Sequence, residues 1–157
     1  MPEVNREHMD RDDVIDTLEK LIETCRDGQN GFRDSAEHVK DPELKAFFNE
    51  LSLERARFAG DLENEAIRLG KSDVDRKGSA TAGLHRTWID LKANLGGGDD
   101  SILSSAETGE DNAKKNYEQA LQQNLPEDIL GLIRQQAQSI FAAHDKIKLL
   151  RDRRKAA

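Results

Sequence analysis

Cysteine, proline and aromatic residues are scarce in this chain, and each shortage narrows the possible folds. The 157 residues include one cysteine, three prolines and 4% aromatic residues. A single cysteine excludes an internal disulfide, and few prolines leave long helices uninterrupted. Because 35% of the residues are charged, the composition favours a thin aliphatic seam between amphipathic helices over a thick sheet-based core.

Long apolar runs and excess positive charge are also missing. No run approaches the roughly 20 apolar residues that span a bilayer, and residues 1–13 lack the apolar segment of a signal peptide. The net charge of -7 disfavours nucleic acid or anionic lipid as the main partner. We therefore expect a cytoplasmic protein without a nucleic-acid or membrane partner. No phosphate-binding loop, Ser–His–Asp order or Cys-x-x-Cys pair indicates a common enzyme class.

Hydrophobic periodicity predicts four long helices. Apolar residues recur at spacings of three and four over residues 11–39, 42–69, 101–121 and 126–153. Asp41 followed by a proline is a typical helix start. The link between the first two helices is so short that they must form an antiparallel hairpin.

A long connection separates the second and third long helices. It contains a polar loop and a shorter expected helix at about 80–95, which ends at a triglycine. Trp88 could anchor this helix to the bundle or line a pocket mouth. Such a connection allows the flanking helices to run parallel, as in ferritin-like bundles. We expect one all-α, ferritin-like four-helix domain at 11–157, made of two antiparallel hairpins, after a flexible segment at 1–10.

Three ionisable residues occupy positions where their helices call for apolar side chains. These are Glu54, Glu110 and His144, on three different helices. Buried charge is costly unless it is paired, hydrogen-bonded or metal-bound. Counting from the hairpin turns places Cys25 level with Glu54, each about 15 residues from the first turn. Glu107 matches the level of His144 better than Glu110 does, so the sequence predicts a loose mid-bundle cluster.

Each member of this cluster also has an ordinary structural explanation. Glu54 could lie at the edge of the seam and pair with Arg55 or Arg57. Glu110 could belong to a solvated acidic face, and His144 could be a hydrogen-bonded core residue. A free cysteine is commonly a small buried hydrophobe.

Four stretches, which together cover nearly the whole chain beyond the first dozen residues, carry a family resemblance. They are LIETCRDGQNGFRDSAEHVKDPELKAFFNELSLERARFAGDLENE, LHRTWIDLKANLGGGDDSIL, GEDNAKKNYEQAL and AAHDKIKLLRDR. The sequence resembles a bacterial family of ferritin-like four-helix-bundle proteins of unknown function, distantly related to rubrerythrin and bacterioferritin. The resemblance implies a fold but brings no established activity.

The wider superfamily implies a di-iron pattern of Glu, Glu-x-x-His, Glu and Glu-x-x-His on successive helices. Three ligand positions of that pattern are kept, at Glu54, Glu110 and His144. Three are replaced: Cys25 stands for the first Glu, Arg57 for the first His and Phe141 for the Glu partner of His144. The resemblance therefore implies a degenerate site in which O₂ activation by two irons is not expected.

Two functions from different classes remain. The first is a non-enzymatic, stress-related or interaction protein whose metal centre is largely lost, with Arg57 pairing the core carboxylates. The second is a protein that holds one iron, manganese or zinc ion for redox or peroxide chemistry. Its ligands would be Glu54, Glu110 and His144, with Glu107 and Cys25 as additional candidates.

A second apolar strip on the helices bears on possible partners. The strip either covers the connection or forms a homodimer contact. It consists of Ile15, Ile22, Phe48 and Phe141. An unknown protein partner is the other expectation for a surface-acting bundle.

Overall fold

Four long helices account for most of the structure, a computed structural model that describes residues 9–71, 88 and 96–156. They are α1 (Arg11–His38), α2 (Pro42–Arg68), α4 (Asp99–Leu121) and α5 (Glu127–Ala156). These described residues contain no strand, which confirms the all-α prediction. The expected helix at 80–95, apart from Trp88, and most of the segment 1–10 lie outside the described residues. None of the helices in the described part combines the length and apolar character that a membrane span requires.

Local signals at the start and end of α2 act as the sequence predicts. The Asp41 carboxylate accepts a hydrogen bond from the backbone N–H of Glu43 at 2.9 Å, and a proline follows it as the first helical residue. Gly70 leaves the helix with φ of 103°, a conformation that favours glycine. The hairpin turn and the end of α2 are thus encoded locally.

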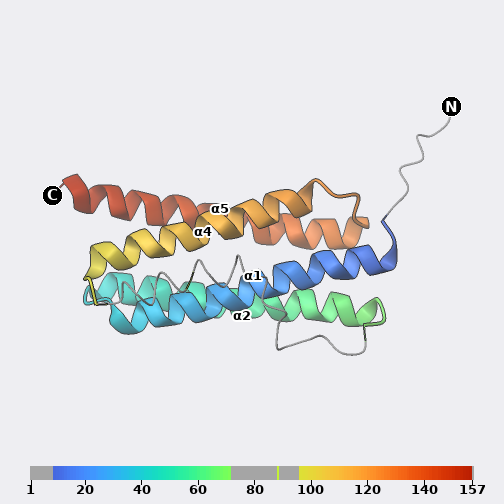
Figure 1. Cartoon of the computed structure of the whole chain (residues 1–157), viewed down its shortest axis with the longest axis horizontal. Coiled ribbons are helices and arrows are strands. Elements are labelled where there is room, and N and C mark those ends of the chain that lie inside the picture. Colours follow the sequence, from blue (N-terminus) through green and yellow to red (C-terminus); the bar gives the residue numbers. More distant parts are fainter. Residues whose placement is uncertain (1–8, 72–87, 89–95, 157) are drawn as a thin grey trace.

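The helices form two antiparallel hairpins, α1 with α2 and α4 with α5, and α4 packs against α1 (Figure 1). The Asp99 carboxylate accepts hydrogen bonds from the backbone N–H groups of Lys40 and Asp41, at 2.8 and 3.0 Å. Helix α4 therefore begins beside the α1–α2 turn. At the other end of the bundle, Arg68 at the end of α2 pairs with Asp128 at the start of α5, at 2.6 Å. Helices α2 and α4 consequently run in the same direction, in agreement with the expectation from the long connection.

The core consists of two apolar clusters along the length of the bundle, and all four helices contribute to both. The cluster where α1 begins includes Leu18, Leu62, Tyr117 and Ile133. The cluster at the α1–α2 turn includes Phe32, Phe48, Ile102 and Ile147. Between these clusters lie the buried charged side chains of Arg55 and Glu110.

The second apolar strip belongs to the core and not to a dimer contact. Ile15, Ile22 and Phe48 are buried, and Phe141 packs partly buried against the first cluster. Ile22 belongs to the first cluster and Phe48 to the second. The dimer contact considered for this strip is therefore wrong.

Candidate functional site

A buried ion pair joins α2 to α4 in the middle of the core. Arg55 Nη1 donates to Glu110 Oε1 at 2.8 Å, and Arg55 Nη2 donates to the other carboxylate oxygen. The two side chains are 1% and 0% exposed. Burial disfavours the charged guanidinium, but the Glu110 carboxylate outweighs it, so the pKa of Arg55 rises above its ordinary value. Such a two-pronged contact is among the strongest that a carboxylate makes.

Neighbouring residues on α1 make room for the guanidinium. A Cβ atom at Gly28 would lie 3.3 Å from Arg55 Nη1, closer than most side-chain contacts. The Phe32 ring lies 5.2 Å from the Arg55 guanidinium carbon, in a cation–π contact. A glycine inside α1, which costs about 1 kcal/mol relative to alanine, is thus explained by the space that Arg55 needs.

The register of α2 differs from the predicted one by a single residue at this level. Arg55 is buried, Glu54 is only partly buried and Arg57 is exposed. The prediction that Glu54 points inward and that Arg57 pairs the core carboxylates is therefore wrong. Helical spacing allows either Glu54 or Arg55 to lie between Leu51 and Phe58 on the buried face of α2. Arg55 takes that position, where it pairs with the carboxylate of Glu110.

Uncharged polar side chains form a polar layer with the ion pair across the middle of the core and extend it toward α5. The Cys25 thiol donates to the Tyr117 hydroxyl at 3.1 Å, and Tyr117 donates to Gln136 Oε1 at 2.8 Å. Gln136 Nε2 in turn donates to the backbone oxygen of Phe58 at 3.3 Å. Burial raises the pKa of Cys25 to about 11 and the pKa of Tyr117 well above its ordinary value. The thiol therefore stays protonated at neutral pH, whereas metal ligation requires the thiolate.

Trp88 reaches the core between α1 and α4. A Cβ atom at Gly31 or at Gly109 would overlap the indole ring. The ring also meets Phe32 edge to face, with centroids 5.3 Å apart. These contacts support the anchoring role predicted for Trp88. The signal that sequence reasoning missed is the pair of helix-interior glycines that its ring requires.

A second group of ionisable side chains lies at the edge between α4 and α5. Glu107, Asp111 and His144 each offer one ligand atom, and these atoms lie within 4.8 Å of one another. His144 Nε2 is 2.5 Å from Asp111 Oδ1. Asp111 is 60% exposed, whereas Glu107 and His144 are each 12% exposed. The spacing of four residues on α4 places both carboxylates on one face, opposite His144 on α5.

Two other charged side chains contact this group. Arg151 Nη1 lies 2.5 Å from Glu107 Oε1, and His144 Nδ1 lies 3.2 Å from Asp145 Oδ1. The Arg151 contact is an ion pair without hydrogen-bond alignment, so this buried Glu107 oxygen accepts no hydrogen bond. The group therefore already has a competing cation beside Glu107.

The predicted ligands are divided between these two places. Glu110 lies in the ion pair with Arg55, and His144 lies at the α4–α5 edge. Among the described residues, one group of acidic, His or Cys side chains is close enough to share an ion, and it excludes Glu54, Glu110 and Cys25. Of the predicted residues, Glu107 and His144 do come together. Asp111 was missed as a ligand, although its spacing from Glu107 was visible in the sequence.

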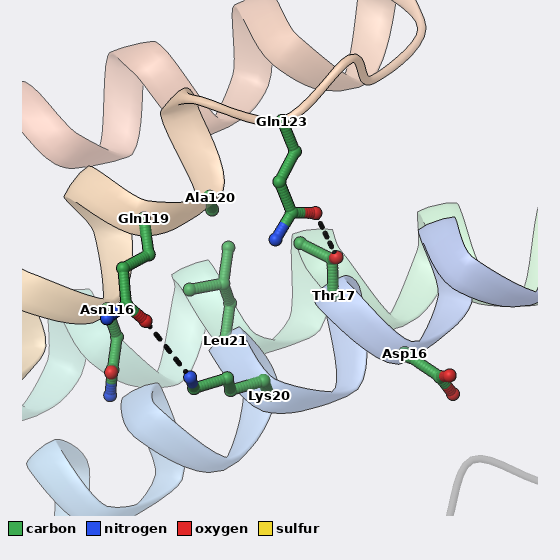
Figure 2. Close-up of a pocket in the computed structure, with 8 residues that line it drawn as sticks. All are labelled: Asp16, Thr17, Lys20, Leu21, Asn116, Gln119, Ala120 and Gln123. Atoms are coloured by element: carbon green, nitrogen blue, oxygen red, sulfur yellow. Dashed lines mark hydrogen bonds between the residues drawn. The ribbon is translucent and has the colours of Figure 1, made fainter. Parts of the chain in front are cut away.

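A groove of about 190 Å³ lies between α1 and α4 (Figure 2). Its polar side chains largely satisfy one another: Thr17 donates to Gln123 at 2.5 Å, and Lys20 donates to Gln119 at 3.2 Å. Asp16 points away from these pairs in Figure 2. The groove therefore offers a ligand few unsatisfied groups.

The comparisons with known proteins agree with a family of unassigned activity. No curated protein matches the sequence. Residues 13–123, more than half of the chain, match the model of the Domain of unknown function (DUF2383). This match covers α2, α4 and all but the first two residues of α1, and therefore both partners of the Arg55–Glu110 pair. The chain belongs to the DUF2383 family.

Proposed function

We propose that this chain is a ferritin-like bundle in which an ion pair takes the place of a core metal centre, and that it acts through its surface as a self-associating or partner-binding protein. The observation that carries the proposal is the contact between Arg55 and Glu110, with both side chains buried. The ferritin-like assignment is supported by two hairpins whose inner helices, α2 and α4, run in parallel.

The chemistry of the core argues against a metal there. Both oxygens of Glu110 already accept hydrogen bonds from Arg55. A cation placed beside the guanidinium would be repelled in a medium that screens charge poorly. Cys25, the thiol at this level of the core, is held in its neutral form. The charges of Arg55 and Glu110 therefore balance each other without a metal ion.

The test compares variants of the ion pair. Arg55→Met and Glu110→Leu should each destabilise the protein by about 3–5 kcal/mol, because each leaves a buried charge unpaired. The double variant should recover much of that loss, since both charges are removed together. Urea unfolding of the three variants measures these free energies.

Metal analysis supplies the outcome that would end the proposal. Protein purified without chelator should contain no stoichiometric metal that depends on Glu110. A stoichiometric ion that is lost in Glu110→Gln, together with metal-dependent stability of the wild type, would show that Glu110 is a ligand.

A second candidate function, a protein that binds a single divalent ion, is favoured by the α4–α5 edge. Two carboxylates and an imidazole nitrogen form a ligand set used by iron, manganese and zinc. We propose Glu107, Asp111 and His144 as the ligands of such an ion, with the exposed side of Asp111 open to water. Arg151 would have to release Glu107.

Thermal unfolding with added Mn²⁺ or Zn²⁺ tests this candidate. A ligand at about 100 times its Kd stabilises a protein by about 2.7 kcal/mol, so the wild type should show a clear rise in Tm. His144→Ala and Asp111→Asn should lose that rise, and Glu118→Gln, an exposed carboxylate on the same helix, should keep it. Equal shifts in all variants would reveal non-specific binding and remove the candidate.

A further inference from the structure

The outer face of α2 carries two large apolar side chains in water. Leu53 is 68% exposed and Ile67 is 55% exposed. Gly60 lies halfway between them, and nothing lies within 4 Å of a Cβ atom placed there. Because seven residues make almost two full helical turns, all three share one face of the helix.

This face points away from the bundle. Leu51, Arg55 and Leu62, which are buried, lie on the opposite side of α2. Arg57 and Asp61 are exposed, and their spacing of four residues places both along one edge of the apolar face. The outer face therefore combines two apolar side chains, a glycine between them, and an edge with one basic and one acidic side chain beside that glycine.

We propose that a second copy of this chain packs on the outer face of α2, with the two α2 helices antiparallel and a two-fold axis at Gly60. In this arrangement Leu53 of one copy faces Ile67 of the other, and the contact occurs twice. The glycines at the crossing permit close approach of the two helix backbones. The inference rests on the surface-acting function proposed above and identifies its partner.

Charge complementarity selects this arrangement over a parallel one. An antiparallel two-fold axis places the charged edges of both copies on the same side of the contact. Arg57 lies three residues before Gly60 and Asp61 one residue after it, so Arg57 of one copy and Asp61 of the other differ by only ~3 Å along the helices. In a parallel pair the two edges lie on opposite sides of the contact and cannot meet. The two Asp61 side chains also lie ~3 Å apart along the helices and repel each other, but that contact occurs once, whereas the attraction of Arg57 for Asp61 occurs twice. The balance of charges favours the antiparallel pair.

The expected dimer is weak. A contact through one helix from each copy buries less area than a standard stable interface, and each copy carries a net charge of -7. The association should therefore depend on protein concentration. Salt screens both the repulsion between the copies and the attraction of Arg57 for Asp61, so the variants below are compared at one ionic strength.

Cysteine cross-linking distinguishes the possible arrangements. The native Cys25 is buried, so new surface cysteines react against a low background. Gly60→Cys should form a disulfide with its own copy, because residues at the axis approach within the about 4.4–6.8 Å that a disulfide needs. Leu53→Cys alone and Ile67→Cys alone should remain monomeric, since each lies ~21 Å along the helix from its counterpart. A mixture of these two variants should cross-link.

Charge reversal tests the pairing at the edge. Arg57→Asp should raise the Kd of the dimer several-fold, because it sets a carboxylate beside Asp61 of the second copy. Asp61→Arg should raise it likewise, and the double variant should recover the wild-type Kd, since opposite charges meet again. Lys115→Asp, the same change of charge at an exposed residue on α4, is the matched control. A double variant as weak as the single ones would contradict the antiparallel register.

Sedimentation of the unmodified chain supplies the independent measurement. The wild type should show a monomer–dimer equilibrium, and Leu53→Glu with Ile67→Glu should be monomeric with unchanged helix content. Leu149→Glu, at an exposed apolar residue on α5, should dimerise as the wild type does. A wild type that stays monomeric at every concentration, or Leu53→Cys that cross-links to itself, would overturn the proposal. Neither result tests whether the core binds a metal ion, so neither would contradict the proposal that an ion pair replaces the core metal centre.

Discussion

Cys25 is a residue whose ionisation the fold opposes. Its side chain is fully buried, and its thiol donates to Tyr117. Burial raises its pKa from the ordinary 9.0 to about 11, against the smaller opposing effect of the Tyr117 hydrogen bond. The folded chain therefore keeps a proton that the unfolded chain releases in the same pH range.

Alkaline instability follows from this difference. The stabilisation is complete below about pH 9 and is lost as the pH rises to about 11, because only the unfolded thiol ionises there. The difference between the two pKa values corresponds to about 3 kcal/mol. Urea unfolding at pH 7, 9 and 10.5 should show this fall in the wild type.

Cys25→Ser separates the thiol from its neighbour. Serine keeps a hydrogen-bond donor for Tyr117 but does not titrate in this range, so the alkaline fall should become shallower. A residual slope is expected, because the pKa of buried Tyr117 is also raised. An unchanged slope in the variant would show that Cys25 does not ionise on unfolding in this range.

At the residue scale, the sequence indicated that charged side chains lie in the core, but it did not identify all of the residues that carry them. Glu110 was correctly placed inside, since every neighbouring member of its stripe on α4 is buried. On α2, the buried face includes Phe48 and Arg55, whereas Phe47 and Glu54 are only partly buried. Spacing alone cannot choose between adjacent positions when the deciding contact comes from another helix.

At the scale of elements, helices α1 and α4 both pack closely against the indole ring of Trp88. Gly31 and Gly109 both lack the Cβ atom that would strike Trp88. Their cost in helix propensity, about 1 kcal/mol each, is offset by aromatic contact with Phe32 and by burial of the indole.

Gly109→Ala should therefore destabilise the protein by about 1–3 kcal/mol, although alanine is the better helix former. The added methyl group displaces the indole, so the emission of Trp88, the single tryptophan, should shift to longer wavelength. Fluorescence spectra and urea unfolding measure the two effects.

Two comparisons isolate the contact. Gly131→Ala in α5, where a Cβ atom meets nothing within 4 Å, should be neutral or stabilising. In a Trp88→Ala background, Gly109→Ala should lose its penalty, because the ring that it strikes is gone. A penalty that persists in that background would assign the glycine to something other than Trp88.

The helices themselves were predicted closely, because stripe, cap and turn signals are local. Predicted bounds of 42–69 compare with Pro42–Arg68, and 101–121 compare with Asp99–Leu121. The α4–α5 edge was harder to predict. Counting from the turn correctly placed Glu107 level with His144, but the exposure of Asp111 and the competing Arg151 depend on how the two helices cross.

At the scale of the whole molecule, the arrangement of hairpins could be predicted and the division of the core could not. The long connection indicated that α2 and α4 run in parallel, which the pairing of Asp99 with the α1–α2 turn bears out. The charged side chains of Arg55 and Glu110 separate the two apolar clusters. The hydrogen bonds of Cys25, Tyr117 and Gln136 adjoin this pair. These polar contacts involve all four helices, so no single stripe reveals them.

Each helix crosses the polar layer and enters both clusters, so the two halves of the bundle should unfold together. Ile133→Ala removes a fully buried side chain from the cluster remote from Trp88, at an expected cost of about 2–5 kcal/mol. Trp88 fluorescence and far-ultraviolet circular dichroism should follow one urea transition, and the variant should move both midpoints equally.

A matched change in the other cluster completes this test of cooperativity. Val39→Ala, at a buried residue in the cluster that Trp88 contacts, should give the same coincidence with a smaller shift. If Ile133→Ala moved the dichroism midpoint but left the fluorescence midpoint unchanged, the polar layer would divide the bundle into separately unfolding halves. Coincident midpoints in both variants would instead show that the two clusters are coupled across the layer that holds the Arg55–Glu110 pair.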